Sequence, residues 1–347
     1  MAMTSHAEQP DKEPFKTGQA QGESTMRAIT QDVYGSAEVL HLAQIPRPVP
    51  AEHEVLVQVR AAGLDRGVWH LTRGLPYLAR LAFGLRKPKN PVPGMDLAGI
   101  VVAAGPAVTR FAVGDAVFGS GRGSFAEYAV AREDQLAIKP ANLTFKQAAA
   151  VPVSAVTALQ GLRDAGRIEP GQKVLVIGAS GGVGSFAVQL AKAFGAQVTG
   201  VASTAKLEAV RSLGADDVID YTREDFADVA NRYDLILDIA GNPSLARLRR
   251  ALNRTGTAVI TGGEEGGNLT GGMNRQLRAL VLSPFVGQRL TMFIGKVSSA
   301  DLEELTGLIE AGKVKPSIDR TFPLAEVPDA LRYLEAGKVC GKVVITI

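Results

Sequence analysis

The chain has 347 residues, of which 46% are hydrophobic and 38 are glycine. This length favours two domains, and the composition is typical of a globular α/β protein with many tight turns. A net charge of +3 does not indicate a nucleic-acid surface, and no apolar run is long enough to span a membrane. Cys340 is the single cysteine, which excludes an internal disulfide and a thiolate metal cluster and favours a reducing, cytoplasmic compartment.

The first 25 residues differ from the rest of the chain. They are polar and charged and lack the hydrophobic run of a secretory signal. Their acidic residues and their lack of arginine argue against a transit peptide. We therefore expect residues 1–25 to form a disordered tail, with the folded part beginning near Met26.

Residues 26–139 carry the pattern of β structure. Short apolar runs alternate with glycine and proline, which favour turns. The expected strands are Val55–Val59, Gly99–Ala103, Ala116–Phe118 and Phe125–Val130. This part of the chain is therefore predicted to be a β-rich domain.

The pattern changes to α/β after Ala141. Either Asn142 or Thr144 is placed to cap a helix that runs through an alanine-rich stretch to about Ala165. The continuous apolar run Lys173–Ile177 is typical of a parallel strand that is covered on both faces.

An alternation of strands and helices follows this first strand. A helix with apolar residues at helical spacing is expected from Val183 to Phe194, where Gly195 can end it. The further strands are expected at Gln197–Val201, Asp217–Asp220, Leu235–Asp238, Ala258–Thr261 and Leu290–Ile294, with helices near 204–213, 223–231, 244–252 and 299–311. The alternation predicts an α/β fold with a doubly wound parallel Rossmann sheet.

A glycine-rich turn lies between the first parallel strand and the helix after it. Its residues are Gly178, Ala179, Ser180, Gly181, Gly182, Val183 and Gly184. A bound pyrophosphate needs a tight turn, a backbone without obstructing Cβ atoms and free amides at a helix N-terminus. The spacing is one residue longer than the common G-x-G-x-x-G pattern, and an ordinary tight turn is the alternative. The flanking strand and helix favour a nicotinamide dinucleotide site.

The tip of the second parallel strand indicates which dinucleotide binds. NAD sites usually have an acidic residue there, but this chain has Ser203, Thr204 and Lys206. Hydroxyls and an ammonium attract a 2′-phosphate, so we expect NADPH rather than NADH. In the alternative interpretation, the two hydroxyls only cap the next helix and the lysine is solvated.

Several motifs together resemble the medium-chain dehydrogenase/reductase superfamily, in its zinc-independent, quinone-oxidoreductase-like branch. The motifs are the glycine turn, Gly94–Gly99, Gly114–Phe118, Gly123–Tyr128, Gly214–Tyr221 and Gly341–Val344. The resemblance implies a GroES-like domain at 26–145, completed by 314–347, and a Rossmann domain at 146–313. It further implies a homodimer with the nicotinamide between the two domains. In this branch a serine, a lysine and a tyrosine often hold the 2′-phosphate, and they match Ser203, Lys206 and Tyr221; a plain surface tyrosine is the alternative for Tyr221.

The zinc enzymes of this superfamily bind a catalytic metal with two cysteines and a histidine. By motif position these sites correspond to Asp65, Met95 and Val153, so none of the three residue types is preserved. The single cysteine also cannot form a four-cysteine structural zinc site. We therefore expect an enzyme without zinc.

Without zinc, direct alcohol oxidation lacks a means of forming the alkoxide. A quinone or an α,β-unsaturated carbonyl needs only a hydride, hydrogen-bond donors and a proton. Asp65 and His70 are the catalytic candidates, with a structural carboxylate paired with Arg66 and an ordinary, partly exposed histidine as the alternatives. Thr157 and Lys342 are expected near the cofactor; the alternatives are a packed threonine and a solvated lysine.

Two segments, Leu75–Lys87 and Asn268–Arg289, are candidates for the walls of an apolar substrate pocket. A dimer contact or loop packing is the alternative for each. Two other functions stay open: an NADP-dependent reductase or dehydrogenase of another carbonyl or alcohol, and a nucleotide-binding protein without turnover.

Overall fold

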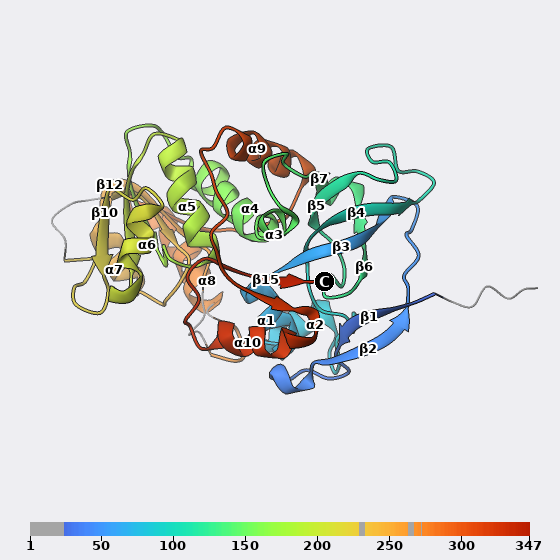
Figure 1. Ribbon diagram of the computed structural model, residues 1–347. Helices are drawn as coiled ribbons and strands as arrows, with labels where there is room; N and C mark the ends of the chain where they lie inside the picture. Colours follow the sequence, from blue (N-terminus) through green and yellow to red (C-terminus); the bar gives the residue numbers. More distant parts are fainter. Residues whose placement is uncertain (1–23, 229–232, 263–266, 272) are drawn as a thin grey trace, which may run out of the picture.

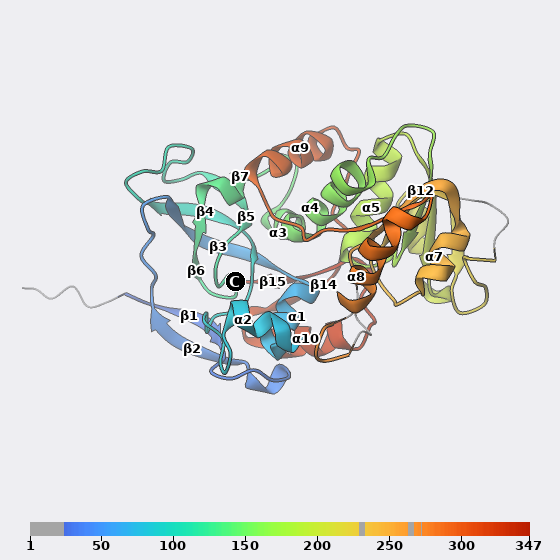
Figure 2. The same cartoon turned by 180° about the vertical axis from the view of Figure 1, so that it is seen from behind.

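The computed structural model describes residues 24–228, 233–262, 267–271 and 273–347. Figure 1 shows a β-rich part and an α/β part side by side, and Figure 2 shows the same arrangement from behind. Helices α3 (Phe145–Ala149), α4 (Pro152–Gln160) and α9 (Ser299–Glu310) lie where the two parts meet. The two parts are not two successive halves of the chain, because the C-terminal strand returns to the β-rich part.

The β-rich part contains a mainly antiparallel sheet in the order β14-β15-β3-β4-β5-β7, with β6 paired to β3. A separate antiparallel pair is formed by β1 and β2. The strands of this part are β1 (Thr25–Thr30), β2 (His41–Pro46), β3 (Glu54–Leu64), β4 (Asp96–Ala104), β5 (Ala116–Ser120), β6 (Tyr128–Arg132), β7 (Leu136–Ile138), β14 (Ile318–Pro323) and β15 (Lys342–Thr346). The four strands predicted here all exist, but β6 begins at Tyr128 rather than at Phe125.

The α/β part is built on a parallel sheet in the order β10-β9-β8-β11-β12-β13. Its strands are β8 (Lys173–Ile177), β9 (Gln197–Ala202), β10 (Asp217–Asp220), β11 (Tyr233–Asp238), β12 (Leu252–Ile260) and β13 (Arg289–Met292). The strand order reverses direction between β8 and β11, which is where open α/β sheets bind their ligands. The predicted doubly wound sheet is therefore confirmed.

Helices cover both faces of the parallel sheet, and other helices lie beside the β-rich part. The remaining α-helices are α1 (Arg66–Arg73), α2 (Arg80–Phe83), α5 (Gly182–Ala193), α6 (Leu207–Ser212), α7 (Leu245–Ala251), α8 (Met273–Leu282) and α10 (Val327–Glu335). Short turns of 3-10 helix occur at Ala37–Val39, Tyr77–Ala79, Glu133–Gln135, Thr204–Lys206, Ser283–Phe285 and Leu324–Glu326. Of the helix expected near 223–231, residues 229–231 lie outside the described part, and the residues before them form turns.

The single helix expected to end near Ala165 is instead three consecutive elements. Thr144 caps α3 with a capping box, in which its hydroxyl accepts from the Gln147 amide. The chain restarts at Pro152 as α4, since a proline cannot continue a helix but suits the first turn of a new one. A π-helical turn, Gly161–Gly166, follows α4. Periodicity alone did not separate these elements.

The hydrophobic core has a layer on each side of the parallel sheet and a third layer inside the β-rich part. One layer holds α4, α5 and α9 against the sheet through residues such as Val156, Phe186 and Leu302. The opposite layer contains Leu248 of α7 and Ile236 of β11. The β-rich part has its own core, so each sheet is stabilised by buried apolar surface of its own.

The expected tail ends slightly earlier than residue 25, because Thr25 already pairs with Pro46 in the strand pair β1–β2. Residues 1–23 lie outside the described part of the chain. The expectation of a disordered tail therefore stays a prediction for them.

Candidate functional site

The glycine turn connects the end of β8 to the start of α5 at the reversal of strand order. Gly178 adopts φ +86°, a backbone conformation that favours glycine. The amides of Gly178 and Ala179 both donate to the carbonyl of Val201 on β9. The turn is thus fixed against the neighbouring strand, and the chain leaves it directly into α5.

The N-terminus of α5 presents its first amides without a side-chain cap. Gly181 is the N-cap residue and makes no capping hydrogen bond through a side chain. A Cβ at Gly184 would lie 2.1 Å from the Gly178 carbonyl oxygen, so glycine lets α5 pack directly on the end of β8. At Gly181 a Cβ would meet no atom nearer than 3.6 Å. The open space and the uncapped amides fit a diphosphate group.

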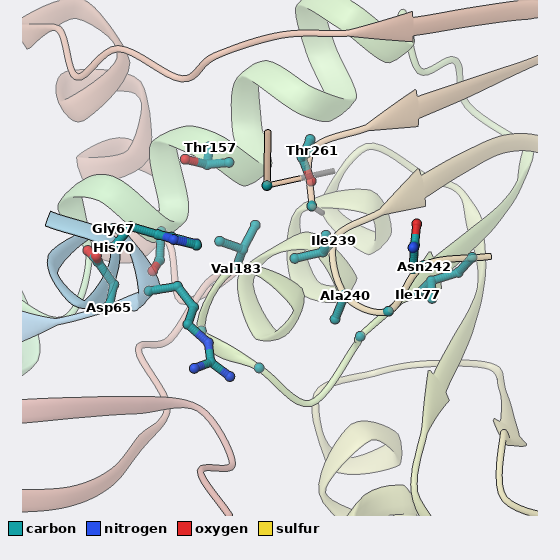
Figure 3. Close-up of a pocket in the computed structure, with 18 of the residues that line it drawn as sticks. Asp65, Gly67, His70, Thr157, Ile177, Val183, Ile239, Ala240, Asn242 and Thr261 are labelled. Carbon is teal, nitrogen blue, oxygen red and sulfur yellow. The ribbon is translucent and has the colours of Figure 1, made fainter. Parts of the chain in front are cut away.

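A cleft of about 1270 Å³ extends from this turn between the two parts of the molecule. In Figure 3, Val183 lies between Asp65, Gly67 and His70 on one side and Ala240 and Asn242 on the other. Residues at the ends of strands from both sheets line the cleft. Its volume exceeds that of an ordinary single-ligand pocket. This volume is large enough for a dinucleotide together with a second, smaller molecule.

Twelve of the residues predicted from the sequence line this cleft. They are Asp65, His70, Thr157, Gly178, Ser180, Gly181, Gly182, Val183, Ser203, Lys206, Tyr221 and Lys342. The other three do not face it. Ala179 is buried, Gly184 packs on β8, and the hydroxyl of Thr204 donates to Asp220.

The tip of β9 forms one end of the cleft. Ser203 makes no capping hydrogen bond, which contradicts the alternative in which it caps the next helix. The Lys206 ammonium donates to the carbonyls of Gly337 (2.9 Å) and Val339 (2.8 Å), so this lysine is held in place rather than fully solvated. Tyr221 is 63% exposed. These three residues lie around one end of the cleft, and their contact with a 2′-phosphate stays a prediction.

Two further charged residues line the same end of the cleft and were missed in the sequence. Arg247 lies in the first turn of α7 and forms an ion pair with Asp225 at 2.8 Å. Glu224 lies in the turn after β10. Neither stands in a motif, and only the meeting of β10 with the start of α7 brings them to the cleft. Sequence spacing alone carried no signal for them.

A buried cluster of charged groups lies at the opposite end of the cleft. The Lys342 ammonium donates to Asp96 at 3.2 Å and to the Ser154 hydroxyl at 3.0 Å. It also lies 3.8 Å from Asp65. Lys342 is only 1% exposed, so the alternative of a solvated lysine is wrong. Four separate segments of the chain meet at this ammonium.

The C-terminal return also touches the glycine turn. The Gly341 amide donates to the Ser180 carbonyl at 2.8 Å. A Cβ at Gly182 would lie 3.0 Å from Cδ of Lys342. The cluster and the turn are therefore in direct contact, and this contact joins the two parts of the molecule.

Asp96 is the member of this cluster that sequence reasoning missed. Its other carboxylate oxygen accepts from the Val153 amide at 3.0 Å. Burial raises the pKa of Asp96 to about 7, an effect that Lys342 opposes and that Asp65 reinforces. An acidic residue within the apolar motif Gly94–Gly99 is the sequence signal that could have identified it, because an acid there needs a buried partner.

Asp65 has both a structural and a cleft-facing role. One of its carboxylate oxygens accepts from the Val68 amide at 3.1 Å and caps α1. The other oxygen is buried, has no hydrogen-bond partner in the described part of the chain, and lies on the Lys342 side. Protonation of this second oxygen would therefore leave the cap intact.

His70 and Thr157 line the cleft on either side of this cluster. His70 lies one turn further along α1, and its Nδ1 donates to the Leu75 carbonyl at 3.1 Å, which fixes the ring. Thr157 donates to Val153 at 2.7 Å, in agreement with the alternative of a threonine that packs within its helix. Thr157 therefore contributes shape rather than a hydrogen-bond donor.

The two candidate substrate walls are hydrogen-bonded to each other. The amide of Tyr77 donates to the Asn268 carbonyl at 2.9 Å, and that of Leu78 donates to Leu269 at 3.4 Å. From the first wall the cleft is lined by Leu75, Pro76, Ala79, Arg80 and Phe83, and from the second by Thr270, Gly271, Met273 and Gln276. The last part of the second wall faces solvent rather than the cleft, since Phe285 is strongly exposed.

Arg275 holds the second wall against the parallel sheet instead of lining the cleft. Its guanidinium bonds to Asp238 at the end of β11 at 2.5 Å. It also donates to the carbonyls of Pro243 and Gly262. Burial raises the pKa of Asp238 to about 6, and Arg275 opposes that shift. The pair therefore positions the start of α8.

Asp65, Met95 and Val153, at the positions of the zinc ligands in related enzymes, do lie close together. Gly67 is in contact range of both Asp65 and Met95, and Val153 bonds to Asp96. Within the described ranges between residues 24 and 347, no group of three or more His, Cys, Asp or Glu residues is arranged to hold a metal. None of the described helices is both long and apolar enough to cross a membrane.

Comparison with known families matches both parts of the chain. Residues 51–141 match the family model described as the alcohol dehydrogenase GroES-like domain. Residues 213–345 match the model described as zinc-binding dehydrogenase. The predicted combination of a GroES-like part with a Rossmann sheet is thereby confirmed.

Individual relatives match over nearly the whole chain. The 2-methylene-furan-3-one reductase of Solanum lycopersicum is 36% identical, covering 93% of this chain and 79% of the relative. The chloroplastic NADPH-dependent alkenal/one oxidoreductase of Arabidopsis thaliana is 38% identical, covering 92% and 79%. The solved quinone oxidoreductase of Coxiella burnetii has a TM-score of 0.83 at 29% identity, covering 93% of this chain and 100% of that one.

The raised pKa of Asp96 predicts a specific dependence of stability on pH. The folded chain retains a proton on Asp96 from its ordinary value of 3.8 up to about 7, where the unfolded chain has lost it. The contribution of Asp96 to the unfolding free energy is therefore present below that window and lost as pH rises through it. We expect the difference in unfolding free energy between the natural chain and Asp96→Asn to fall from pH 4 to pH 7, by denaturant titration.

The surface variant Asp217→Asn serves as the matched control, because Asp217 is exposed. Its difference from the natural chain should stay level across the same pH range. A level or rising difference for Asp96→Asn would show that the carboxyl of Asp96 is ionised throughout.

Proposed function

Since this chain belongs to the medium-chain dehydrogenase/reductase family, in its quinone-oxidoreductase-like branch, and is an NAD(P)H-dependent oxidoreductase, we propose that it uses NADPH to reduce quinones or α,β-unsaturated carbonyls without zinc. The observation that carries this proposal is the open, uncapped glycine turn beside a cleft that also holds apolar walls. The names of the relatives, which include enone and quinone reductases, support the same acceptor class.

The chain's own residues account for cofactor binding. The amides of Gly182, Val183 and Gly184 would hold the diphosphate, because the first amides of α5 lack partners within the helix. Ser203, Lys206 and Tyr221 would hold the 2′-phosphate at the tip of β9, where the preference for NADPH over NADH arises. Arg247 adds a second cation at this end of the cleft.

The other end of the cleft supplies the groups for reduction. A bound NADPH supplies a hydride to an electron-poor carbon of the acceptor. Asp65 and His70 are the proposed catalytic residues, because both line the cleft and can orient or donate a proton. Lys342 provides a fixed positive charge next to Asp65. This charge would stabilise the negative charge that develops on the acceptor oxygen.

We also propose that the chain forms a homodimer through the outer edge of the parallel sheet. Strand β13 pairs only with β12 in the described structure, so its other edge is unpaired. Leu277, Val281 and Phe285 expose apolar surface beside this edge. Edge strands of this kind pair readily with a second chain. The expected cytoplasmic location stays a prediction.

Steady-state oxidation of NADPH with a panel of quinones, enones and simple alcohols tests the proposed reaction. We expect turnover with the first two classes and none with the alcohols, and treatment with a chelator should leave the rate unchanged. Asp65→Asn should lower kcat by about a hundredfold, the usual contribution of a general acid or base, while the exposed control Asp32→Asn should not.

Binding of NADPH without turnover on any acceptor would refute the enzymatic proposal and favour a nucleotide-binding protein. Loss of activity on chelation would refute zinc independence alone. An unchanged kcat and pH profile in Asp65→Asn would remove this residue from catalysis.

Cofactor preference depends on Lys206. We expect Lys206→Glu to raise the Kd for NADPH much more than that for NADH, because the new carboxylate repels a 2′-phosphate. Lys338→Glu makes the same charge change at a neighbouring exposed site that does not line the cleft. Titration by nicotinamide fluorescence measures both values, and equal losses for the two coenzymes would exclude Lys206 from the 2′-phosphate site.

The dimer proposal predicts that a charge at the sheet edge separates the subunits. Phe285→Asp places a carboxylate in the exposed apolar surface beside β13, where burial against a second chain would be costly. Light scattering should give twice the chain mass for the natural protein and a single chain mass for the variant. A natural protein of single-chain mass would refute the dimer.

A further inference from the structure

The first cleft wall has an outer face that the proposed reaction does not use. Its inner residues Ala79 and Phe83 line the cleft. On the outside, Leu81 is 70% exposed and Leu85 is 67% exposed, and Tyr77 and Leu78 are exposed beside them. Large apolar side chains are thus gathered within nine residues on the solvent side of the cleft.

The same segment carries unbalanced positive charge. The sequence contains no aspartate or glutamate between Asp65 and Asp96. Arg86, Lys87 and Lys89 follow the apolar residues directly and are exposed. Among the residues that the structure describes, no ion pair or side-chain hydrogen bond is recorded for any of these three cations. Their charges therefore face solvent.

The backbone of this segment is held firmly from beneath. The Arg80 guanidinium lies between the rings of Tyr34 (4.5 Å) and Tyr77 (4.8 Å) and donates to the Gly74 carbonyl at 2.8 Å. Tyr34 donates to the Gly84 carbonyl at 2.7 Å. These contacts fix the turn in a position that keeps its leucines outward. The exposed apolar surface is thus a property of the folded turn.

We propose that residues Tyr77–Lys89 form a docking surface for an anionic lipid membrane. Exposed leucine and aromatic side chains next to several lysines and arginines are what binds the interface of an anionic bilayer, because the apolar groups enter the acyl boundary and the cations remain at the headgroups. A second copy of the chain fits less well, since a symmetric contact would bring together two copies of a segment that carries Arg86, Lys87 and Lys89 and no acidic residue.

The docking surface and the cleft share one wall. An apolar acceptor dissolved in the bilayer would meet the outer leucines of this wall at the rim of the cleft that Ala79 and Phe83 line. Delivery of a lipid-soluble acceptor is the part of the inference that rests on the proposed function. Membrane docking itself depends only on the surface.

Co-sedimentation of the full chain with vesicles tests the docking surface. Phosphatidylcholine vesicles with phosphatidylglycerol should bind the protein, and vesicles of phosphatidylcholine alone should bind it weakly. Added salt should reduce binding to the anionic vesicles by screening the cations. In the combined variant Leu81→Ser, Arg86→Glu and Lys87→Glu, we expect the partition coefficient to fall by at least about a hundredfold, given the contribution of each cation near the membrane.

The matched control removes one apolar side chain and reverses two cations elsewhere, as Val113→Ser, Lys313→Glu and Lys315→Glu, all at exposed positions. It has the same net charge as the docking-surface variant and should bind anionic vesicles like the natural chain. An unchanged affinity for NADPH confirms that each variant is folded, because the coenzyme's phosphates bind far along the cleft at the glycine turn.

Three results would overturn the inference. The first is equally low sedimentation of the natural chain with both kinds of vesicle, and the second is a loss of binding in the control as large as in the docking-surface variant. A docking-surface variant that changes from dimer to monomer in light scattering would instead show that this face contacts a second copy. Vesicle binding requires no turnover, so failure of the reductase assay leaves this test intact.

Discussion

The buried ammonium of Lys342 is the interaction on which the arrangement of the cleft depends. Removing a charge from water is costly unless partners compensate it, and Asp96, Ser154 and Asp65 do so here. These partners come from β4, α4 and the cap of α1, and the lysine itself begins β15. One side chain thus ties the end of the chain to the glycine turn and to the β-rich part.

The two ends of the cleft differ in how they are built. At the tip of β9, charged and hydroxyl groups lie on exposed turns, as expected of a site that reads a phosphate through side chains. At the Lys342 end the groups are buried and hold one another in fixed positions. Fixed charge in a poorly hydrated site acts more strongly on a developing oxyanion than the same charge in water. The difference between the ends matches the proposed division between cofactor recognition and reduction.

Much of the fold was predictable because regular patterns determine it. The apolar run Lys173–Ile177 and the glycines after it identified β8 and the turn, and the structure contains each predicted parallel strand. Arg247 could not be found in this way, because its role arises from chain segments that meet only in three dimensions. The acid in the apolar motif Gly94–Gly99 indicates a buried partner for Asp96, but only the fold shows that this partner is Lys342. The break at Pro152 was also missed, since the alanine-rich composition on both sides of it continues unchanged. Local patterns thus predicted the frame of the site, and long-range packing determined its charges.

The two amide-to-carbonyl bonds between Tyr77 and Leu78 and the 268–269 segment have a consequence for how such a protein can diverge. They are made by the main chain, so they do not depend on which side chains stand at these positions. Leucines and aromatic residues along either wall can be exchanged while the rim of the cleft keeps its span. Selection can therefore change the range of acceptors without rebuilding the frame that encloses them.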